Sequence, residues 1–404
     1  MAKALLRLNN VEVRRSMQVV LRDHSLTVHE GECVALVGNN GSGKSTLLET
    51  AAGLLPLERG SVAHGETVRI DAEGRRRPSP LTVGLTLQKN GAIGSETVSE
   101  HLQLAMVRSG QRLDLEPFLE AFRLKHRARD FIAHLSQGQA RKVAVLSGLL
   151  PAFAARQPGL VLLDEPATGL DEAAVDQLRT WIGELRSLGH GILLCTHDPR
   201  LREVATSVHD VTQRRSTPQT PLAGETRSRA VEAARTMTPG RFGVSTHWRT
   251  MLWLNTNGMA ALLTLGVLLA LGDLTASITP LQQLGLVLAP ALAAGLCGEP
   301  LVAAMREERA SDWWRGVADG VPHAAWLPFA LGAALTAIAS VSLGDGVEAT
   351  RAMAGAGITW GAWHAVRFAQ RSADRLARPH AVMVGLLTPT LILPYALLID
   401  WMTR

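Results

Sequence analysis

The sequence predicts an α/β domain followed by an all-α bundle of transmembrane helices, and two observations lead to this prediction. Up to about residue 247, short apolar runs alternate with amphipathic segments, a pattern typical of strands and helices layered in an α/β domain. Beyond that point charges become rare, and in the range 251–305 only Asp273 and Glu299 are charged. A long uncharged apolar stretch crosses a bilayer as a helix because its backbone groups then pair within the segment.

The length and composition of the chain exclude several kinds of protein. The chain has 404 residues, enough for two or three domains, of which 47% are hydrophobic and 19% are charged. This charge content is too low for long disordered tails. The three cysteines (Cys33, Cys195 and Cys297) lie too far apart for a disulfide scaffold and lack the spacing of zinc ligands. The N-terminal residues contain no apolar core long enough for a secretory signal, so we expect the first domain to stay in the cytosol.

The second half is predicted to be a transmembrane domain, 248–404, with about five or six helices. The five apolar stretches are 252–271, 279–297, 322–342, 350–369 and 381–399. Arginines cluster after the second stretch and again after the fourth, so the positive-inside rule places both of these loops in the cytosol. The alternative, buried helices of a soluble protein, fits several such stretches in a row poorly. We therefore expect a multi-pass protein of the cytoplasmic (inner) membrane.

A connector, 216–247, joins the two predicted domains. Its first part contains Pro218 and Pro221, and a later part, 227–237, intersperses arginines among alanines. We interpret this as a linker and a basic amphipathic connector helix on the cytosolic leaflet of the bilayer. A nucleic-acid-binding arm is the competing interpretation, but no aromatic residues are interleaved with the basic ones, so no nucleic acid is expected as a partner.

A phosphate-binding loop pattern follows the buried-strand run 34–38. It comprises Gly38, Asn39, Asn40, Gly41, Ser42, Gly43, Lys44, Ser45 and Thr46, and a helical pattern comes next. Glycines allow consecutive backbone N–H groups to surround phosphates, which also meet the positive end of the following helix. The expected roles are contact of Lys44 with the β- and γ-phosphates and ligation of Mg²⁺ by the Ser45 hydroxyl.

Two more buried strands end in polar side chains. The run 160–164 ends in Asp164 and is followed by Glu165. Asp164 is placed to hold Mg²⁺, whereas Glu165 points the other way along the strand and is the candidate base that polarises the attacking water. The run 191–195 leads to His197, a candidate sensor of the γ-phosphate.

A further motif lies between these strands and reads Leu135, Ser136, Gln137, Gly138 and Gln139. With the preceding motifs, it makes residues 1–215 resemble the nucleotide-binding domain of ATP-binding cassette (ABC) proteins, because six short motifs occur in the order of that family. The resemblance implies an α/β P-loop NTPase (ABC ATPase) fold with ATP and Mg²⁺ as cofactors. The chain as a whole then resembles a half-transporter, in which the cassette precedes a small membrane domain similar to those of ABC-2 exporters.

Residue by residue, the resemblance implies further roles. Gln88 matches the Q-loop glutamine, which contacts Mg²⁺ or the attacking water, and His197 matches the switch histidine. Ser136 and Gly138 match signature residues that bind the γ-phosphate of the ATP held by the partner subunit, and Asp171 matches the D-loop.

Two positions depart from the family pattern. Gln137 stands where glycine is commonest in the signature. The aromatic residue that stacks on adenine is expected near residues 14–17, yet none is there, and Arg15 is the candidate that stacks its guanidinium plane on the base instead.

A functional expectation follows from the resemblance. Each ATP in this family lies between the phosphate loop of one subunit and the signature of another, so this chain must act as a homodimer or as a heterodimer with a related subunit. We expect ATP-driven export of an unidentified substrate. A charged segment, 305–316, resembles the coupling segment of ABC-2 exporters, which implies that it presses against the Gln88 region and couples the cassette to the membrane helices. An ordinary interfacial loop, with Trp313 and Trp314 at the membrane surface, is the alternative. The alternative is a membrane-anchored ATPase that drives or regulates a partner complex without moving a substrate itself.

Overall fold

A computed structural model describes most of the chain. The described residues are 2–15, 17–94, 96–106, 109, 111–221, 238–239, 253–270, 280–300, 309–318, 326–343, 346–372 and 383–388. The chain divides into two compact units, one formed by 1–243 with 305–321 and the other by 244–304 with 322–404. Most of the predicted connector (222–237 and 240–247) lies outside the described residues.

A six-stranded sheet forms the centre of the first unit, in the order β11-β10-β3-β9-β8-β6. Its strands are β3 (Cys33–Val37), β6 (Val83–Thr86), β8 (Leu160–Asp164), β9 (Gly191–Cys195), β10 (Ser207–Asp210) and β11 (Arg215–Pro218). All neighbours pair in parallel except β10 and β11. The strands β8 and β9 are buried along their whole length, as continuous apolar runs in a parallel sheet should be.

A second, antiparallel sheet has four strands in the order β2-β1-β4-β5. They are β1 (Ala4–Arg15), β2 (Gln18–His29), β4 (Arg59–His64) and β5 (Thr67–Asp71). Apolar and polar residues alternate in β1 and β2, so one face of this sheet packs inward. A short pair, β7 (Gln111–Arg112) and β12 (Thr238–Pro239), forms a further ladder.

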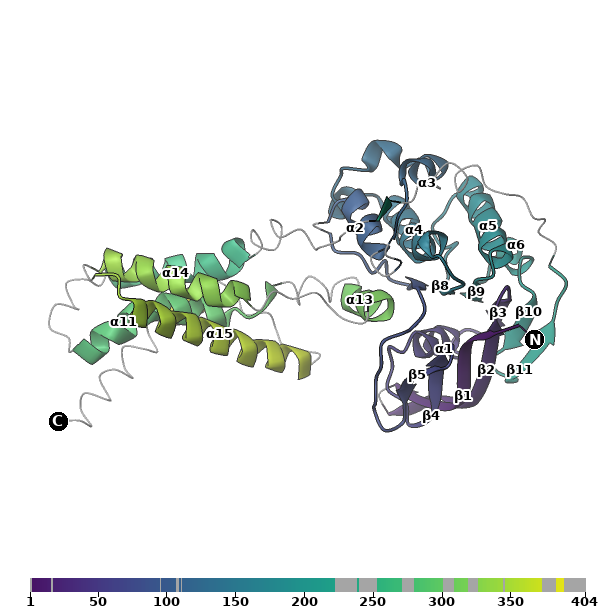
Figure 1. The fold of residues 1–404 in the computed structure, drawn as a ribbon, viewed down its shortest axis with the longest axis horizontal. Coiled ribbons are helices and arrows are strands. Elements are labelled where there is room, and N and C mark those ends of the chain that lie inside the picture. The colour runs from purple at the N-terminus through teal and green to yellow at the C-terminus, as the bar shows by residue number, and fades with distance from the viewer. Residues whose placement is uncertain are drawn as a thin grey trace. The chain divides into compact units, whose positions relative to one another are not determined.

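Helices cover the two sheets (Figure 1). The helix α1 (Lys44–Ala51) contacts strands of both sheets, whereas α4 (Gln137–Ala154) and α5 (Glu172–Ser187) pack against β8 and β9 respectively. The main core lies between these helices and the central sheet and includes the fully buried Trp181. The other helices among the described residues of this unit are α2 (Val98–Ala105), α3 (Glu116–Ala121), α6 (Pro199–Arg202), α13 (Ala310–Ala318) and the 3₁₀ turns Lys125–Arg127 and Ile132–His134.

The second unit is helical, as predicted. It contains α9 (Met259–Ala270), α11 (Pro280–Leu296), α14 (Trp326–Ser342) and α15 (Ala349–Ser372), with a π-helical turn, Leu254–Gly258, before α9. Glycine allows close packing of α14 and α15, since a Cβ on Gly355 would lie only 1.7 Å from Oγ1 of Thr336.

The lengths and compositions of these helices bear on the predicted membrane spans. The helices α11 and α14 have 17 residues each, and α15 has 24 but carries three arginines. Within the described part of the chain, no helix has both the length and the apolarity needed to cross a bilayer. The helical character of the C-terminal region is thus confirmed, but none of its described helices is both long and apolar enough to span a membrane. Most of the fifth predicted span lies outside the described residues.

Candidate functional site

A glycine-rich loop, 38–43, connects the carboxyl end of β3 to the first turn of α1. Gly43 precedes the helix with φ 97°, and a Cβ there would lie 3.0 Å from Cδ2 of Leu21, so only glycine fits. Gly38 has φ 140°, and a Cβ on it would lie 2.7 Å from Oγ of Ser42. The loop therefore follows a path that requires glycine, and it lies at the carboxyl ends of the parallel strands, where α/β folds hold ligands.

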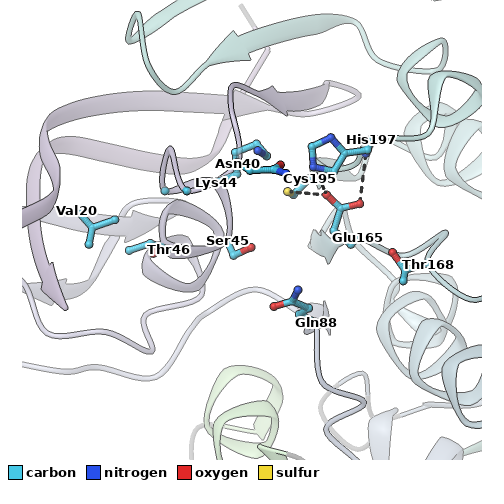
Figure 2. Close-up of a pocket in the computed structure, with 12 residues that line it drawn as sticks. Val20, Asn40, Lys44, Ser45, Thr46, Gln88, Glu165, Thr168, Cys195 and His197 are labelled. Carbon is cyan, nitrogen blue, oxygen red and sulfur yellow. Dashed lines mark hydrogen bonds and ion pairs between the residues drawn. The ribbon is translucent and has the colours of Figure 1, made fainter. Parts of the chain in front are cut away.

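A cavity of about 560 Å³ lies beside this loop. Its lining residues are Val20, Asn40, Gly41, Gly43, Lys44, Ser45, Thr46, Gln88, Glu165, Thr168, Cys195 and His197. Figure 2 shows Glu165 and His197 on the side opposite Val20 and Thr46, with Gln88 approaching from a third side. The structure thus brings together the phosphate loop, Gln88, Glu165 and His197, which were singled out from separate parts of the sequence.

Lys44 is the cation of the cavity, and its side chain is bound to the loop itself. Its Nζ donates to the carbonyl oxygens of Gly38 at 2.8 Å and Asn39 at 3.0 Å, which curls the loop around the ammonium group. The side-chain oxygen of Ser42 is buried without a hydrogen-bond partner. A loop with a fixed ammonium group and an unpartnered hydroxyl is suited to binding phosphate oxygens.

Ser45 and Asp164 form the candidate magnesium site. The Ser45 hydroxyl donates to Oδ1 of Asp164 at 3.0 Å, while Oδ2 of the fully buried Asp164 has no partner. Burial raises the pKa of the Asp164 carboxyl, and a cation beside it would favour the ionised form. Hydroxyl and carboxylate oxygens are ligands that Mg²⁺ prefers, so this pair fits the ion. In the described residues, no group of three or more His, Cys, Asp or Glu side chains could hold a metal, and nucleotide phosphates would complete the coordination.

Glu165 is held in an unusual backbone conformation beside His197. Its φ is 47°, and its backbone N–H donates to the carbonyl of Cys195 at 2.8 Å across the sheet. Oε2 accepts from the backbone N–H of His197 at 3.3 Å, and Oε1 lies 3.3 Å from Nε2 of the same residue. The Cys195 thiol lies 3.7 Å from Oε1 (Figure 2). The carboxylate is therefore fixed where it faces the cavity, as a base that orients water must be.

Gln88 is anchored through its backbone by Arg141 of α4. Nη1 of Arg141 donates to the carbonyl of Leu87 at 2.7 Å and lies 3.4 Å from that of Gln88. Nη2 donates to the carbonyls of Asp164 at 2.8 Å and Glu165 at 2.7 Å. Burial lowers the pKa of this guanidinium, with partial compensation from the two nearby carboxylates. One side chain thus fixes the Gln88 segment against the end of β8.

The other predicted site residues lie elsewhere in the same unit. The motif residues Ser136, Gln137, Gly138 and Gln139 are absent from the described lining of the cavity; Ser136 and Gln139 instead form a capping box at the start of α4. Asp171 caps α5 and accepts from Nζ of Lys142 at 2.6 Å, which lowers the pKa of its carboxyl. Asn39 and Ser42 line a neighbouring cavity of about 490 Å³ together with Asn40 and Gly41.

Arg15 is also outside the described lining of the main cavity. Its guanidinium forms an ion pair with Glu49 of α1, and its side chain is 41% exposed. Stacking of Arg15 on adenine would therefore compete with a carboxylate that already holds it.

Sequence reasoning did not identify four residues that the structure brings to the site. Val20, Thr168 and Cys195 line the cavity, and Arg141 donates to backbone carbonyls of residues beside it. A signal existed for Cys195, because it ends the strand beside Asp164, and the two residues are paired in register. No motif marks Arg141, whose role depends on where α4 lies against β6 and β8.

The ABC transporter family model matches residues 21–168 of the chain. Among curated proteins, the chain is 35% identical over 205 residues to "Zinc import ATP-binding protein ZnuC" of Chelativorans sp. (strain BNC1), covering 50% of this chain and 66% of that protein. It is 33% identical to "ABC-type transporter ATP-binding protein EcsA" of Bacillus subtilis (strain 168), covering 44% and 71%. It is 34% identical to "Taurine import ATP-binding protein TauB" of Escherichia coli O157:H7, covering 44% and 68%. The matches span about two thirds of these relatives.

Among solved structures, one described as "Structure of ATP binding subunit of ABC transporter" is 29% identical, with a TM-score of 0.45, over 53% of this chain and 90% of that one. A dimeric structure of a bacterial ABC transporter cassette is 20% identical with the same TM-score, over 53% and 98%.

Proposed function

This chain belongs to the ABC transporter family, and from that premise we propose that it hydrolyses ATP and uses the energy to export a substrate across the cytoplasmic membrane as a dimer. The observation that carries this proposal is the seating of α13 on the cassette. The indole Nε1 of Trp313 donates to the carbonyl of Leu85 at 2.9 Å, three residues before Gln88. A segment from the C-terminal half of the chain thus contacts the strand that leads to Gln88, a residue that lines the cavity.

The hydrolytic step is assigned to residues of the cavity. Lys44 and the backbone N–H groups of its loop bind the β- and γ-phosphates of ATP. Ser45 and Asp164, with Gln88 nearby, hold Mg²⁺, which neutralises phosphate charge when bound. Glu165 orients and polarises the attacking water, and His197 contacts the γ-phosphate from the same side of the cavity. The roles of Lys44, Ser45, Gln88, Glu165 and His197 are consistent with their places in the cavity lining. Asp164 is not part of the described lining, but it accepts a hydrogen bond from Ser45, which is.

The active unit is proposed to be a dimer with shared nucleotide sites. The signature residues 136–139 lie outside the described cavity lining of their own chain. An N-terminus of a helix is suited to contact a phosphate, and α4 begins at this signature with Ser136 as its cap. A second subunit would therefore supply Ser136 and Gly138 to the γ-phosphate, with Asp171 at the junction between subunits.

Export through a membrane domain formed by 248–404 is the second part of the proposal. It is supported by the uncharged apolar stretches of the sequence and by the presence of cassette and helical unit on one chain. The zinc and taurine relatives carry the word import in their names, so the direction needs a direct test. The alternative, an anchored ATPase that drives or regulates a partner complex without transport, predicts hydrolysis with no flux.

Two measurements test the proposal. The specific ATPase activity of the purified full chain should fall on dilution as the dimer dissociates; activity independent of dilution down to the monomer would overturn the shared sites. Inside-out vesicles that contain the chain should then accumulate a solute from cell extract, detected by mass spectrometry, only with ATP, and vesicles with Glu165→Gln should not. Accumulation in right-side-out vesicles would show import, and hydrolysis without any flux would show the anchored ATPase.

A further inference from the structure

Glu49 is a buried carboxylate outside the described lining of the cavity. It lies in α1, the helix that begins at Lys44, and is only 3% exposed. Its carboxylate accepts from Arg15, at the end of β1, and from Arg309, just before α13. Nη1 of Arg309 lies 2.5 Å from Oε1 and Nη2 lies 3.0 Å from Oε2, so this contact is bidentate.

A buried carboxylate needs compensation, because removing a charge from water costs several kcal/mol unless it is paired. Glu49 receives this compensation from two arginines that lie far from it in sequence. The proposed hydrolytic step assigns no role to Glu49. The cluster of Glu49, Arg15 and Arg309 therefore needs an explanation other than ATP chemistry. It joins α1 to the end of β1 and to the start of α13, which suggests a role in attaching these elements to one another.

Arg309 also shapes the start of α13. It has φ 58°, a left-handed conformation that is unfavourable for a non-glycine residue. Its Nε donates to Oδ2 of Asp312 at 2.8 Å, one turn into the helix. The ion pairs with Glu49 and Asp312 raise the pKa of the Arg309 guanidinium, which therefore stays charged. The same side chain thus starts the helix and attaches it to α1.

Two further contacts seat α13 on the cassette. The fully buried Trp313 donates to the Leu85 carbonyl at the end of β6, and Nη2 of Arg69 donates to the carbonyl of Arg315 at 3.0 Å. Gly91 has φ 71°, and a Cβ on it would lie 2.9 Å from Cβ of Trp313, which leaves room only for glycine. The helix is therefore attached on one side to the strand before Gln88 and on the other, through Glu49, to the helix that follows the phosphate loop.

We propose that Glu49 is a positioning residue that ties the segment 309–318 to α1, so that a displacement of the phosphate-binding loop reaches this segment directly as well as through the strand before Gln88. The inference rests on the proposed function, because it assigns the segment the task of transmitting the state of the ATP site. Lys44 and Glu49 lie on the same short helix, and a rigid helix moves as one body. The pair Glu49–Arg309 is then the connection between that body and the segment.

The ion pairs of Glu49 with Arg15 and Arg309 determine which variants test this proposal. Arg309→Gln breaks the connection but leaves Glu49 paired with Arg15, so the buried charge stays compensated and the cassette should fold. Glu49→Gln breaks it from the other side and leaves Arg15 and Arg309, whose side chains are 41% and 28% exposed and can be solvated. Arg315→Gln is the matched control: it removes the same charge from the same segment, 309–318, but the described hydrogen bonds of its side chain go only to Asp312 and the Ser311 carbonyl.

The experiment is hydrogen exchange of the backbone amides of 309–318 in the full chain, with ATP affinity measured in parallel. We expect Arg309→Gln and Glu49→Gln to speed this exchange by about tenfold or more, since the segment then opens more often. Arg315→Gln should change it by less than about threefold, in line with the small contribution of exposed ion pairs. The double variant should exchange no faster than the faster single variant, because both changes break one connection.

The outcomes separate the inference from the proposed function. Unchanged exchange in either single variant would overturn the connection, and so would faster exchange spread equally over α1, β6 and β8, which would mean general loosening of the cassette. ATP affinity should stay within about threefold of the wild-type value in both variants, because neither residue lines the described cavity. Failure of the wild-type chain to bind or hydrolyse ATP would refute the proposed function and leave the exchange comparison intact.

Discussion

The carboxylate of Glu165 contacts His197 at two points. Oε2 lies 3.3 Å from the backbone nitrogen of His197, and Oε1 lies 3.3 Å from its Nε2. Because the backbone of Glu165 is itself held in a left-handed conformation by Cys195, the side chain has little freedom to turn away from the cavity. The proposed base, Glu165, and the proposed contact of the γ-phosphate, His197, are thus positioned by one another.

Replacing this carboxylate should separate ATP binding from turnover. Glu165→Gln keeps the size of the side chain and its capacity to accept from the His197 backbone, but it removes the base. We expect the ATPase rate to fall by about 10²- to 10⁴-fold, the usual contribution of such a group, with ATP affinity retained. Equilibrium binding and phosphate release check the two parts, and size-exclusion chromatography with ATP should show a stabilised dimer. Glu172→Gln, an exposed site at the start of α5, is the control, and wild-type turnover in Glu165→Gln would remove Glu165 from the base role.

Removing the cation of the loop should abolish both steps together. Lys44→Ala deletes the ammonium group that donates to the Gly38 and Asn39 carbonyls. The loop therefore loses two internal hydrogen bonds as well as its proposed contact with phosphate. We expect ATP affinity to fall by about 100-fold or more, as for a lost charge-assisted contact in a buried site. Lys89→Ala, which removes an exposed lysine next to Gln88, should bind ATP normally. Retained binding with lost hydrolysis in Lys44→Ala would contradict this role.

The predicted motifs agree with the observed cavity where a motif determines its own local backbone structure. The sequence itself indicates the glycine-rich loop, the strand before it and the carboxylates at a strand end, because each of these is a local feature. Because parallel strands end at one edge of the sheet, residues as far apart as Ser45 and Asp164 could be expected to meet there, and they lie 3.0 Å apart.

Other contacts depend on packing that no local pattern specifies. Arg15 matched the position of a stacking group, but the structure pairs it with Glu49, because α1 and the end of β1 lie side by side. The seating of Trp313 against Leu85 joins residues 228 positions apart. The charged segment 305–316 was predicted to act on the Gln88 region, yet the carboxylate that receives Arg309 could not be anticipated from spacing alone.

Arg141 should be required for both stability and activity. Its guanidinium bonds to the carbonyls of Leu87, Asp164 and Glu165, and Arg141→Met would leave these buried acceptors without partners. We expect a loss of roughly 3 kcal/mol in the free energy of unfolding, since each unsatisfied group costs about 1–3 kcal/mol. ATPase activity should fall as well, because Gln88 and Glu165 lose a common support. Arg141→Lys should recover part of the stability, and Arg129→Met, at an exposed position, should change neither. Equal melting temperatures for Arg141→Met and wild type would refute the prediction.

His190 should make the cassette sensitive to acid. Burial lowers the pKa of its imidazole to about 4, and Nδ1 accepts from the backbone N–H of Gly159 at 2.8 Å, so the folded state holds the ring neutral. The unfolded chain binds a proton near pH 6.5, the ordinary value, and therefore gains stability relative to the folded state as the pH falls below it. The stability that the neutral ring contributes is present above pH 6.5 and is lost between about pH 6.5 and 4, by at most ~3 kcal/mol.

The variant His190→Asn tests this dependence, because its Oδ1 can accept from Gly159 in place of Nδ1 but does not titrate. Thermal or urea unfolding of the full chain between pH 4 and 8 should show a shallower loss of stability with acid in the variant than in wild type. The readout is the slope, so a constant offset caused by imperfect packing of the smaller side chain does not affect it. Parallel curves over this pH range would show that His190 does not titrate on unfolding in the way its burial requires.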